Sequence, residues 1–308
     1  MSRADGSAAP LQSALNRLCA MLAPRAGSLA ITIFGDSIAL QGQSVWLGGL
    51  VTVMQQFGLN ARQIRTAVFR LGREGWLVPS LSGRRSYYSF TASGERQYAR
   101  AAERIYAANA VRWDGNWTLI SAVGLKPDTR DELRRRLGWL GFGALGSGVF
   151  AHPQAAAATV QDVLRELACA EQVVVWRATA GVDAALAALV RTSWRLDELA
   201  QRFDAFIARF EGFYRLLDSV VEIEPRDAFV LRTLLIHEYR RILLKSTELP
   251  GALLPTTWPG HAARDLTTGL YRRLQAPATH YCCSALENSQ GLLPAPAAGF
   301  AQRFAARA

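Results

Sequence analysis

The stretch 60–88 constrains this chain more than any other, because its pattern predicts an amphipathic helix followed at once by a basic hairpin. Asn60 is suited to begin the helix, since its side chain can accept a free first-turn N–H group. Gly75 marks the end of the helical pattern. Apolar residues recur at spacings of four and three, which places them on one helical face: Ile64, Val68 and Leu71.

The opposite face of this predicted helix is basic. Its residues are Arg62, Gln63, Arg65, Thr66, Phe69, Arg70 and Arg73. Arginine presents a planar fork of donors that suits phosphate and the guanine edge. A solvated charged face is the alternative, but four arginines on one short face are more than solubility requires. We therefore interpret this face as a nucleic-acid-binding surface.

The hairpin that follows favours the same interpretation. Residues 76–78 and 87–90 have the composition of two strands, and 82–85 (Ser-Gly-Arg-Arg) forms the tip between them. A helix followed by a basic hairpin is typical of a winged-helix unit, in which the helix enters the major groove and the wing lies along the backbone. We predict DNA contacts from Arg62, Gln63, Arg65, Thr66, Arg70 and Arg73 on the helix, and from Arg84, Arg85 and Tyr87 on the wing.

The residues before this helix complete the unit. The run 28–40 is strongly apolar, and its period does not separate a strand from a buried helix. Because 46–57 is helical in pattern, and three helices before a wing make a complete unit, we favour a helix. We expect a loosely held, flexible arm at 1–27, a winged-helix domain at 28–92 and a linker helix at 93–112.

The middle of the chain, 113–180, predicts a small α/β sandwich. Its elements follow the order strand, helix, strand, strand, helix, strand, which is the split βαβ or ferredoxin-like arrangement. The predicted strands are 117–123, two within 142–153, and 172–179, and the predicted helices are 128–140 and 159–168.

The remainder is predicted to be helical over 181–287, with a frayed tail at 288–308 rich in Ala, Pro and Gly. Apolar residues form a sustained seam at steps of four and three: Leu199, Phe203, Phe206, Phe210, Phe213 and Leu217. An intramolecular core explains this seam at least as well as a dimer interface, and the helix expected at 91–108 is an equal candidate for that interface. The fold class expected for the whole chain is therefore α+β with several domains.

The net charge, the length of the apolar runs and the cysteine spacing limit the kinds of partner that we expect for this chain. The net charge of +10 favours an anionic partner such as nucleic acid, acidic lipid or a phosphorylated ligand. No apolar run reaches the roughly 18 residues of a membrane span, so we expect a cytoplasmic protein without a membrane partner. The four cysteines lack metal-binding spacing, and we expect no metal and no cofactor.

Enzyme chemistry finds little support in the sequence. No serine has the GxSxG context of a nucleophile elbow, and no Gly-rich dinucleotide loop follows a strand. The histidines are scattered along the chain: His152, His237, His261 and His280. We therefore expect no enzyme. The alternative that stays open is a nucleic-acid-processing or RNA-binding enzyme that uses the winged helix for docking.

Several runs resemble one family. FGDSIALQGQSVWLGGL, NARQIRTAVFRLGREGWL and GRRSYYSFTASG, with HEYRRILLKSTELPGALLPTTWPG and LYRRL further on, are similar to the PaaX family of bacterial repressors of phenylacetic acid catabolism. The resemblance covers about 28–287. It implies a winged helix, a ferredoxin-like middle and a helical C-terminal domain. It also implies a homodimer that binds a palindromic operator and is released by phenylacetyl-coenzyme A.

The middle part also resembles the small CRISPR spacer-acquisition nucleases, which carry a metal-binding aspartate at the end of the first strand. Here that strand ends in Ser121-Ala122-Val123-Gly124, so no carboxylate is present to hold a hard cation. Asp128 and Asp131 are explained as first-turn residues favoured by the helix dipole. We therefore expect no nuclease activity.

A thioester effector has an anionic end that requires arginines or lysines, and an acyl end that requires aromatic walls. The C-terminal region offers both kinds of residue. The cationic candidates are Arg240, Arg241, Lys245, Arg272 and Arg273, and the aromatic candidates are Trp194, Tyr239, Trp258 and Tyr271.

Overall fold

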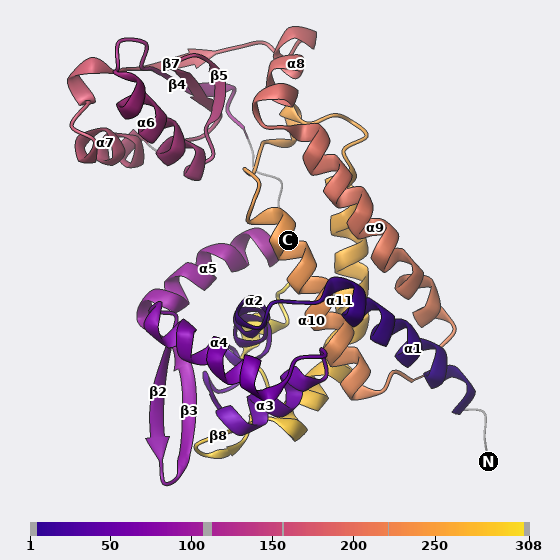
Figure 1. Cartoon of the computed structure of the whole chain (residues 1–308). Helices are drawn as coiled ribbons and strands as arrows, with labels where there is room; N and C mark the ends of the chain where they lie inside the picture. Colours follow the sequence, from indigo (N-terminus) through magenta and orange to yellow (C-terminus); the bar gives the residue numbers. More distant parts are fainter. Residues whose placement is uncertain (1–4, 107–112, 156, 221, 305–308) are drawn as a thin grey trace. The chain divides into compact units, whose positions relative to one another are not determined.

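The structure is a computed structural model that describes residues 5–106, 113–155, 157–220 and 222–304 (Figure 1). Helices predominate and strands form small sheets, so the chain is a mixed α and β protein, as the sequence predicted. The chain divides into two compact units. Unit 1 contains Met1–Ala108, Ala205–Arg241 and Ala262–Ala308, and unit 2 contains Asn109–Asp204 and Ile242–His261.

The helices and strands predicted for the first part of the chain are present in unit 1. The run 28–40 is helical, with a π-helical segment at its end. The short strand β1 was not predicted, because a strand of that length shows no alternation. The elements are α2 (Ala26–Ile33), the π-helix η1 (Phe34–Ile38), β1 (Ser44–Trp46), α3 (Leu47–Gln55), α4 (Ala61–Arg73), β2 (Leu77–Ser82), β3 (Arg85–Phe90) and α5 (Ala92–Tyr106).

The hairpin β2–β3 belongs to a three-stranded antiparallel sheet in which β3 lies between β1 and β2. Ser82 pairs with Arg85, so Gly83 and Arg84 form a two-residue turn. Gly83 has φ of 58°, a left-handed conformation that glycine adopts without a steric penalty. This turn places Arg84 at the tip of the hairpin.

The expectation of a loosely held arm before residue 28 was wrong for its described part. Residues Asp5–Leu22 form the helix α1. Its leucines at positions 11, 15 and 18 are only 2–3% exposed. Their spacing of four and three makes an apolar stripe, and burial of that stripe packs the helix against the rest of unit 1. Residues 1–4 lie outside the described residues.

The C-terminal region is helical, as predicted. Its helices are α8 (Ala184–Ser193), α9 (Leu196–Asp218), α10 (Pro225–Leu243) and α11 (Pro259–Ala285). The last helix extends to Ala285 with Pro277 inside it, although proline usually marks a helix boundary.

The apolar seam of α9 belongs to the core of the chain. Phe206 and Phe210 are fully buried, and the ring of Phe206 lies 5.6 Å from that of Tyr239 on α10. Five of the six seam residues are buried and Leu199 is half-buried, so the seam contributes to an intramolecular core.

The tail after residue 288 is ordered through residue 304, so the expected frayed tail was wrong for that part. It forms the hairpin β8 (Glu287–Asn288) and β9 (Gly291–Leu292), followed by the 3-10 helix η4 (Ala298–Phe300). Phe304 is 3% exposed, and its ring lies 5.4 Å from that of Tyr106 and 5.1 Å from that of Tyr271. Aromatic anchors thus hold a segment whose composition is otherwise typical of a loop.

Unit 2 contains the predicted βαββαβ order. Its elements are β4 (Asn116–Ser121), α6 (Pro127–Trp139), β5 (Gly143–Gly146), β6 (Val149–His152), α7 (Ala157–Glu166) and β7 (Val174–Thr179). The strands are ordered β5-β6-β4-β7, and every neighbouring pair is antiparallel.

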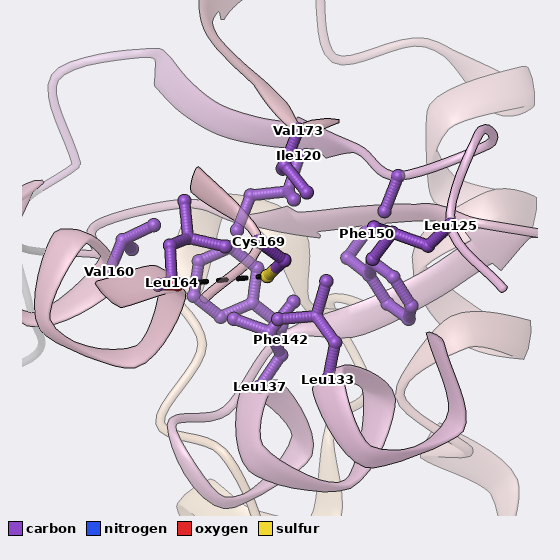
Figure 2. Close-up of a cluster of buried hydrophobic side chains, with 11 residues drawn as sticks. Ile120, Leu125, Leu133, Leu137, Phe142, Phe150, Val160, Leu164, Cys169 and Val173 are labelled. Atoms are coloured by element: carbon purple, nitrogen blue, oxygen red, sulfur yellow. Dashed lines mark hydrogen bonds between the residues drawn. The ribbon is translucent and has the colours of Figure 1, made fainter. Parts of the chain in front are cut away.

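Figure 2 shows the core of unit 2, where side chains from the sheet meet those of α6 and α7. Cys169 is part of this core, and its thiol donates to the Leu164 carbonyl at 3.7 Å. Burial raises the pKa of this thiol, so it is an inert apolar residue. The sheet and helices contribute Ile120, Phe150, Leu133, Leu137, Val160 and Leu164.

Candidate nucleic-acid interface

The start of α4 is fixed by a reciprocal cap. The Asn60 side chain accepts from the Gln63 backbone N–H at 2.9 Å, and the Gln63 side-chain oxygen accepts from the Asn60 N–H at 2.9 Å. Such a capping box satisfies two N–H groups at the helix start. It also occupies the Gln63 carbonyl oxygen, so only the amide NH₂ of this predicted DNA-contacting residue is left for a partner.

The two faces of α4 separate as the sequence predicted. Ile64 and Val68 are fully buried, and Leu71 is 2% exposed. The outward face is exposed at every position that the sequence assigned to it, including Phe69, which is 65% exposed. Arg70 makes an exposed pair with Glu74 at 3.4 Å, one helical turn away. The exposed polar residues are Arg62, Gln63, Arg65, Thr66, Arg70 and Arg73.

The three wing candidates have different surroundings. Arg84 is exposed at the turn. Arg85 pairs with Glu287 of the C-terminal hairpin at 2.7 Å, and its guanidinium lies 4.4 Å from the ring centre of Trp46. Tyr87 is only 6% exposed, so its side chain is part of the core rather than a surface that a phosphate could reach.

A buried ion-pair network that the sequence reasoning missed lies within unit 1. Asp36, on η1, is 1% exposed and pairs with Arg232 of α10 at 3.0 Å and with Arg303 of the tail at 3.0 Å. The hydroxyls of Tyr106 and Tyr271 donate to the same carboxylate oxygen at 2.6 and 3.0 Å. One carboxylate therefore balances two buried guanidiniums.

The network joins α5, α10, α11 and the tail to the π-helical segment. Burial, and next to it the Asp36 charge, raise the pKa of Tyr106 and Tyr271, so both stay protonated and donate. One sequence signal pointed to it: a lone carboxylate inside the apolar run 28–40 must find partners, because a buried unpaired charge is costly.

The cationic effector candidates are mostly engaged in contacts within the chain. Arg240 donates to the Thr32 hydroxyl at 2.9 Å, and Arg241 pairs with Glu238 at 2.7 Å. Arg272 donates to a backbone carbonyl of the tail at 2.8 Å. Arg273 pairs with the carboxylate at the end of α9. Lys245 is exposed and belongs to unit 2.

The aromatic effector candidates are core residues. Tyr239 and Tyr271 are 2% and 0% exposed in unit 1. In unit 2, the Trp194 indole donates to the Gly141 carbonyl at 2.9 Å, and the Trp258 ring packs edge-on 5.8 Å from Phe203. The candidates are thus divided between the units, and each aromatic one fills a packed position.

The described part of the chain offers neither a metal site nor a membrane-spanning helix. No cluster of three or more His, Cys, Asp or Glu side chains there could hold a metal ion. No helix there has the length and hydropathy needed to cross a bilayer.

Comparisons with known proteins cover almost the whole chain. Residues 25–94 match the family model "PaaX-like protein", 110–190 match "PaaX protein central Cas2-like domain", and 194–284 match "PaaX-like protein C-terminal domain". The chain is 40% identical over 281 residues to "Transcriptional repressor PaaX" of Escherichia coli (strain K12), covering 90% of this chain and 89% of that protein. Among solved structures it is similar to "Uncharacterized protein Rv0674 from Mycobacterium tuberculosis", with 24% identity and a TM-score of 0.47. The match covers 75% of this chain and 90% of that chain.

Proposed function

This chain belongs to the PaaX family and is a transcriptional repressor rather than an enzyme, and we propose that it represses by binding operator DNA through α4 and the β2–β3 hairpin. The observation that carries the proposal is the exposed, arginine-rich face of α4 followed directly by a hairpin with an exposed arginine at its tip. In this proposal α2, α3, α4 and the three-stranded sheet form a winged helix, and the βαββαβ part of unit 2 is ferredoxin-like.

Different residues have different tasks in the proposed complex. Arg62, Arg65 and Arg73 face the major groove, where a bidentate arginine recognises guanine. The exposed ring of Phe69 contacts a thymine methyl group, the apolar feature of that groove. Arg84 contacts phosphate from the wing and carries no sequence information. Because Tyr87 is buried, we leave it out of the interface.

Two substitutions separate base reading from phosphate contact in fluorescence-anisotropy titrations with upstream DNA. Arg65→Ala is expected to weaken specific binding by about 1–3 kcal/mol and to relax specificity at one base pair. Arg84→Ala is expected to weaken binding to all sequences and to reduce the salt slope by about 0.9. Arg134→Ala, an exposed arginine of α6 paired with Asp131, is the matched control. Parent-like binding by both test variants would refute the placement.

We further propose that the repressor acts as a homodimer on a palindromic site, since one winged helix reads only a short sequence. The α9 seam is buried, and the outward face of α5 is polar. The exposed apolar side chains of β7, Val174 at 51% and Trp176 at 54%, are the better candidates for an interface. Light scattering on the parent and on Trp176→Glu tests this, and a parent that is monomeric with and without operator would exclude the dimer.

The effector proposed for this repressor is an aryl-coenzyme A thioester such as phenylacetyl-coenzyme A, and its target genes are those of phenylacetic acid catabolism. The effector must bind the DNA-free state more tightly than the DNA-bound state, or it shifts nothing. By linkage, operator DNA must weaken thioester binding by the same factor. Calorimetry with phenylacetyl-coenzyme A, free phenylacetate and coenzyme A identifies the part that is recognised, and equal binding of the free acid would contradict recognition of the coenzyme.

A further inference from the structure

A cavity of about 1060 Å³ lies within unit 1 beside the start of α4. Its walls come from the end of α1, the connection into α2, the turn between α3 and α4, and the first turns of α4 itself. Pro24, Phe57 and Leu59 give it apolar surface. The volume is slightly above the range of about 300–1,000 Å³ for small-molecule sites, so it is large enough for a nucleotide-sized ligand.

The cavity has a one-sided charge. Arg25, Arg62 and Arg70 line it, and none of the described residues that line it carries a carboxylate. Arg25 and Arg62 make no ion pair within the described part of the chain, whereas Arg70 pairs with Glu74, which does not line the cavity. Cys19 adds no negative charge at neutral pH, because burial raises the pKa of its thiol to about 11.

The backbone adds to this positive character, because two helices begin at the cavity. The first residues of α2, Ala26 and Gly27, line it, and α2 has no side-chain cap at its start. Free N–H groups and the helix dipole at such a start attract anions. Gly27 also makes room for Arg70, since a Cβ atom there would lie 2.9 Å from the guanidinium.

We propose that this cavity binds a small molecule with several phosphate groups, and that this ligand competes directly with operator DNA. The inference rests on the proposed DNA-binding role of α4, because Arg62, Thr66 and Arg70 line the cavity and also belong to the exposed face of that helix. A phosphate group held by these arginines would take the place of a DNA phosphate. Release would then need no conformational change carried over a distance.

The proposed site differs from the C-terminal site that the sequence analysis predicted from residue types alone. The C-terminal arginines are satisfied by the Thr32 hydroxyl, by a tail carbonyl and by carboxylates, whereas Arg25 and Arg62 have no such partner among the described residues. A polyanion binds where guanidiniums are unpaired, since it need not first displace a carboxylate.

The test uses the full-length protein and two probes that carry the phosphates without an acyl group, coenzyme A and adenosine 3′,5′-bisphosphate. Calorimetry without DNA is run on the parent, on Arg25→Ala and on Arg25→Lys. Arg25 is exposed and lies outside α4, so its loss is not expected to disturb folding or base contacts. Arg273→Ala, from the C-terminal candidates, is the matched control.

Coenzyme A binding is expected to weaken about 10-fold or more in Arg25→Ala, to recover in part in Arg25→Lys, and to be unchanged in Arg273→Ala. Coenzyme A should also displace labelled operator from the parent, and no ternary complex should form. Unchanged binding in Arg25→Ala, or a stable ternary complex, would overturn the proposal. A third outcome would also overturn the proposal: the parent binds neither probe, and Arg25→Ala loses operator binding. In that case the cavity residues would contact the DNA backbone and would not form a ligand site.

The calorimetry separates this proposal from the proposed function. A parent that binds coenzyme A through Arg25 but does not bind upstream DNA would refute the DNA-binding role of α4 and with it the competition. A parent that binds operator but neither probe would leave the repressor intact and refute the cavity as a ligand site.

Discussion

Replacing Asp36 by asparagine is the sharpest test of how unit 1 is held together. The substitution keeps the size of the side chain and an oxygen that can accept from the Tyr106 and Tyr271 hydroxyls. It removes the negative charge and replaces one carboxylate oxygen by an NH₂ group, which cannot accept from a guanidinium. Arg232 and Arg303, which are 0% and 8% exposed, are then left without their carboxylate.

The size of the effect follows from this burial. Removing one partner of a buried ion pair costs about 3–5 kcal/mol, because the remaining charge stays in a poorly solvated site. A whole domain is stable by only about 5–15 kcal/mol. At roughly 2–4 °C per kcal/mol, the melting temperature of Asp36→Asn should fall by about 6–20 °C.

The assay is urea unfolding followed by circular dichroism at pH 7.5, together with thermal melting. Asp162→Asn is the matched control, since its pair with Arg165 is exposed and should change the free energy of unfolding by no more than about 0.5 kcal/mol. Adding Arg303→Met to Asp36→Asn should recover part of the loss, because it removes one uncompensated charge. A loss below about 1 kcal/mol in Asp36→Asn would show that the carboxylate does not hold these arginines.

Three further outcomes are expected. Glu287→Gln frees Arg85 from its ion pair, so DNA should bind more tightly, and the dependence of affinity on salt concentration should be steeper by about 0.9. An unchanged salt dependence in anisotropy titrations would show that Arg85 does not contact DNA. Burial lowers the pKa of His237 to about 3, below the value of about 6.5 in the unfolded chain. Between these two values the unfolded state binds a proton that the folded state does not bind. The free energy of unfolding therefore decreases as the pH falls from about 6.5 towards 3. Denaturant titrations at pH 7 and 5 should show a smaller loss in His237→Gln than in the parent, and an equal loss would remove His237 as the cause. A Cβ at Gly94 would lie 2.4 Å from the Trp76 carbonyl oxygen, so Gly94→Ala should destabilise by about 1–3 kcal/mol in thermal melts, and a neutral result would mean that the backbone shifts freely there.

The elements that sequence reasoning predicted correctly are those specified by local patterns. The period of Ile64, Val68 and Leu71 gave α4, and Asn60 marked its start. The Gly83-Arg84 turn lay between two strand-like runs. In each case the residues that determine the element are within a few positions of one another, so one sequence contains the whole signal.

The features that were mispredicted or missed depend on residues far apart. The composition of the tail predicted a frayed segment. Phe304 of the tail nevertheless packs on Tyr106 and Tyr271, and no local sequence pattern indicates this contact. The partners of Asp36 at positions 232 and 303 are equally remote. The effector candidates were chosen by residue type, and their burial and pairing are decided by tertiary packing that one sequence does not contain.

The ion pair between Asp36 and Arg303 also sets an order of events during synthesis. The two residues are separated by 267 positions, which at about 5–20 residues per second corresponds to roughly 13–53 s on the ribosome. During that time the Asp36 carboxylate lacks the guanidinium of Arg303. We therefore expect the nascent N-terminal part to depend on chaperones, and the ability to bind DNA to arise only after Arg303 has been synthesised.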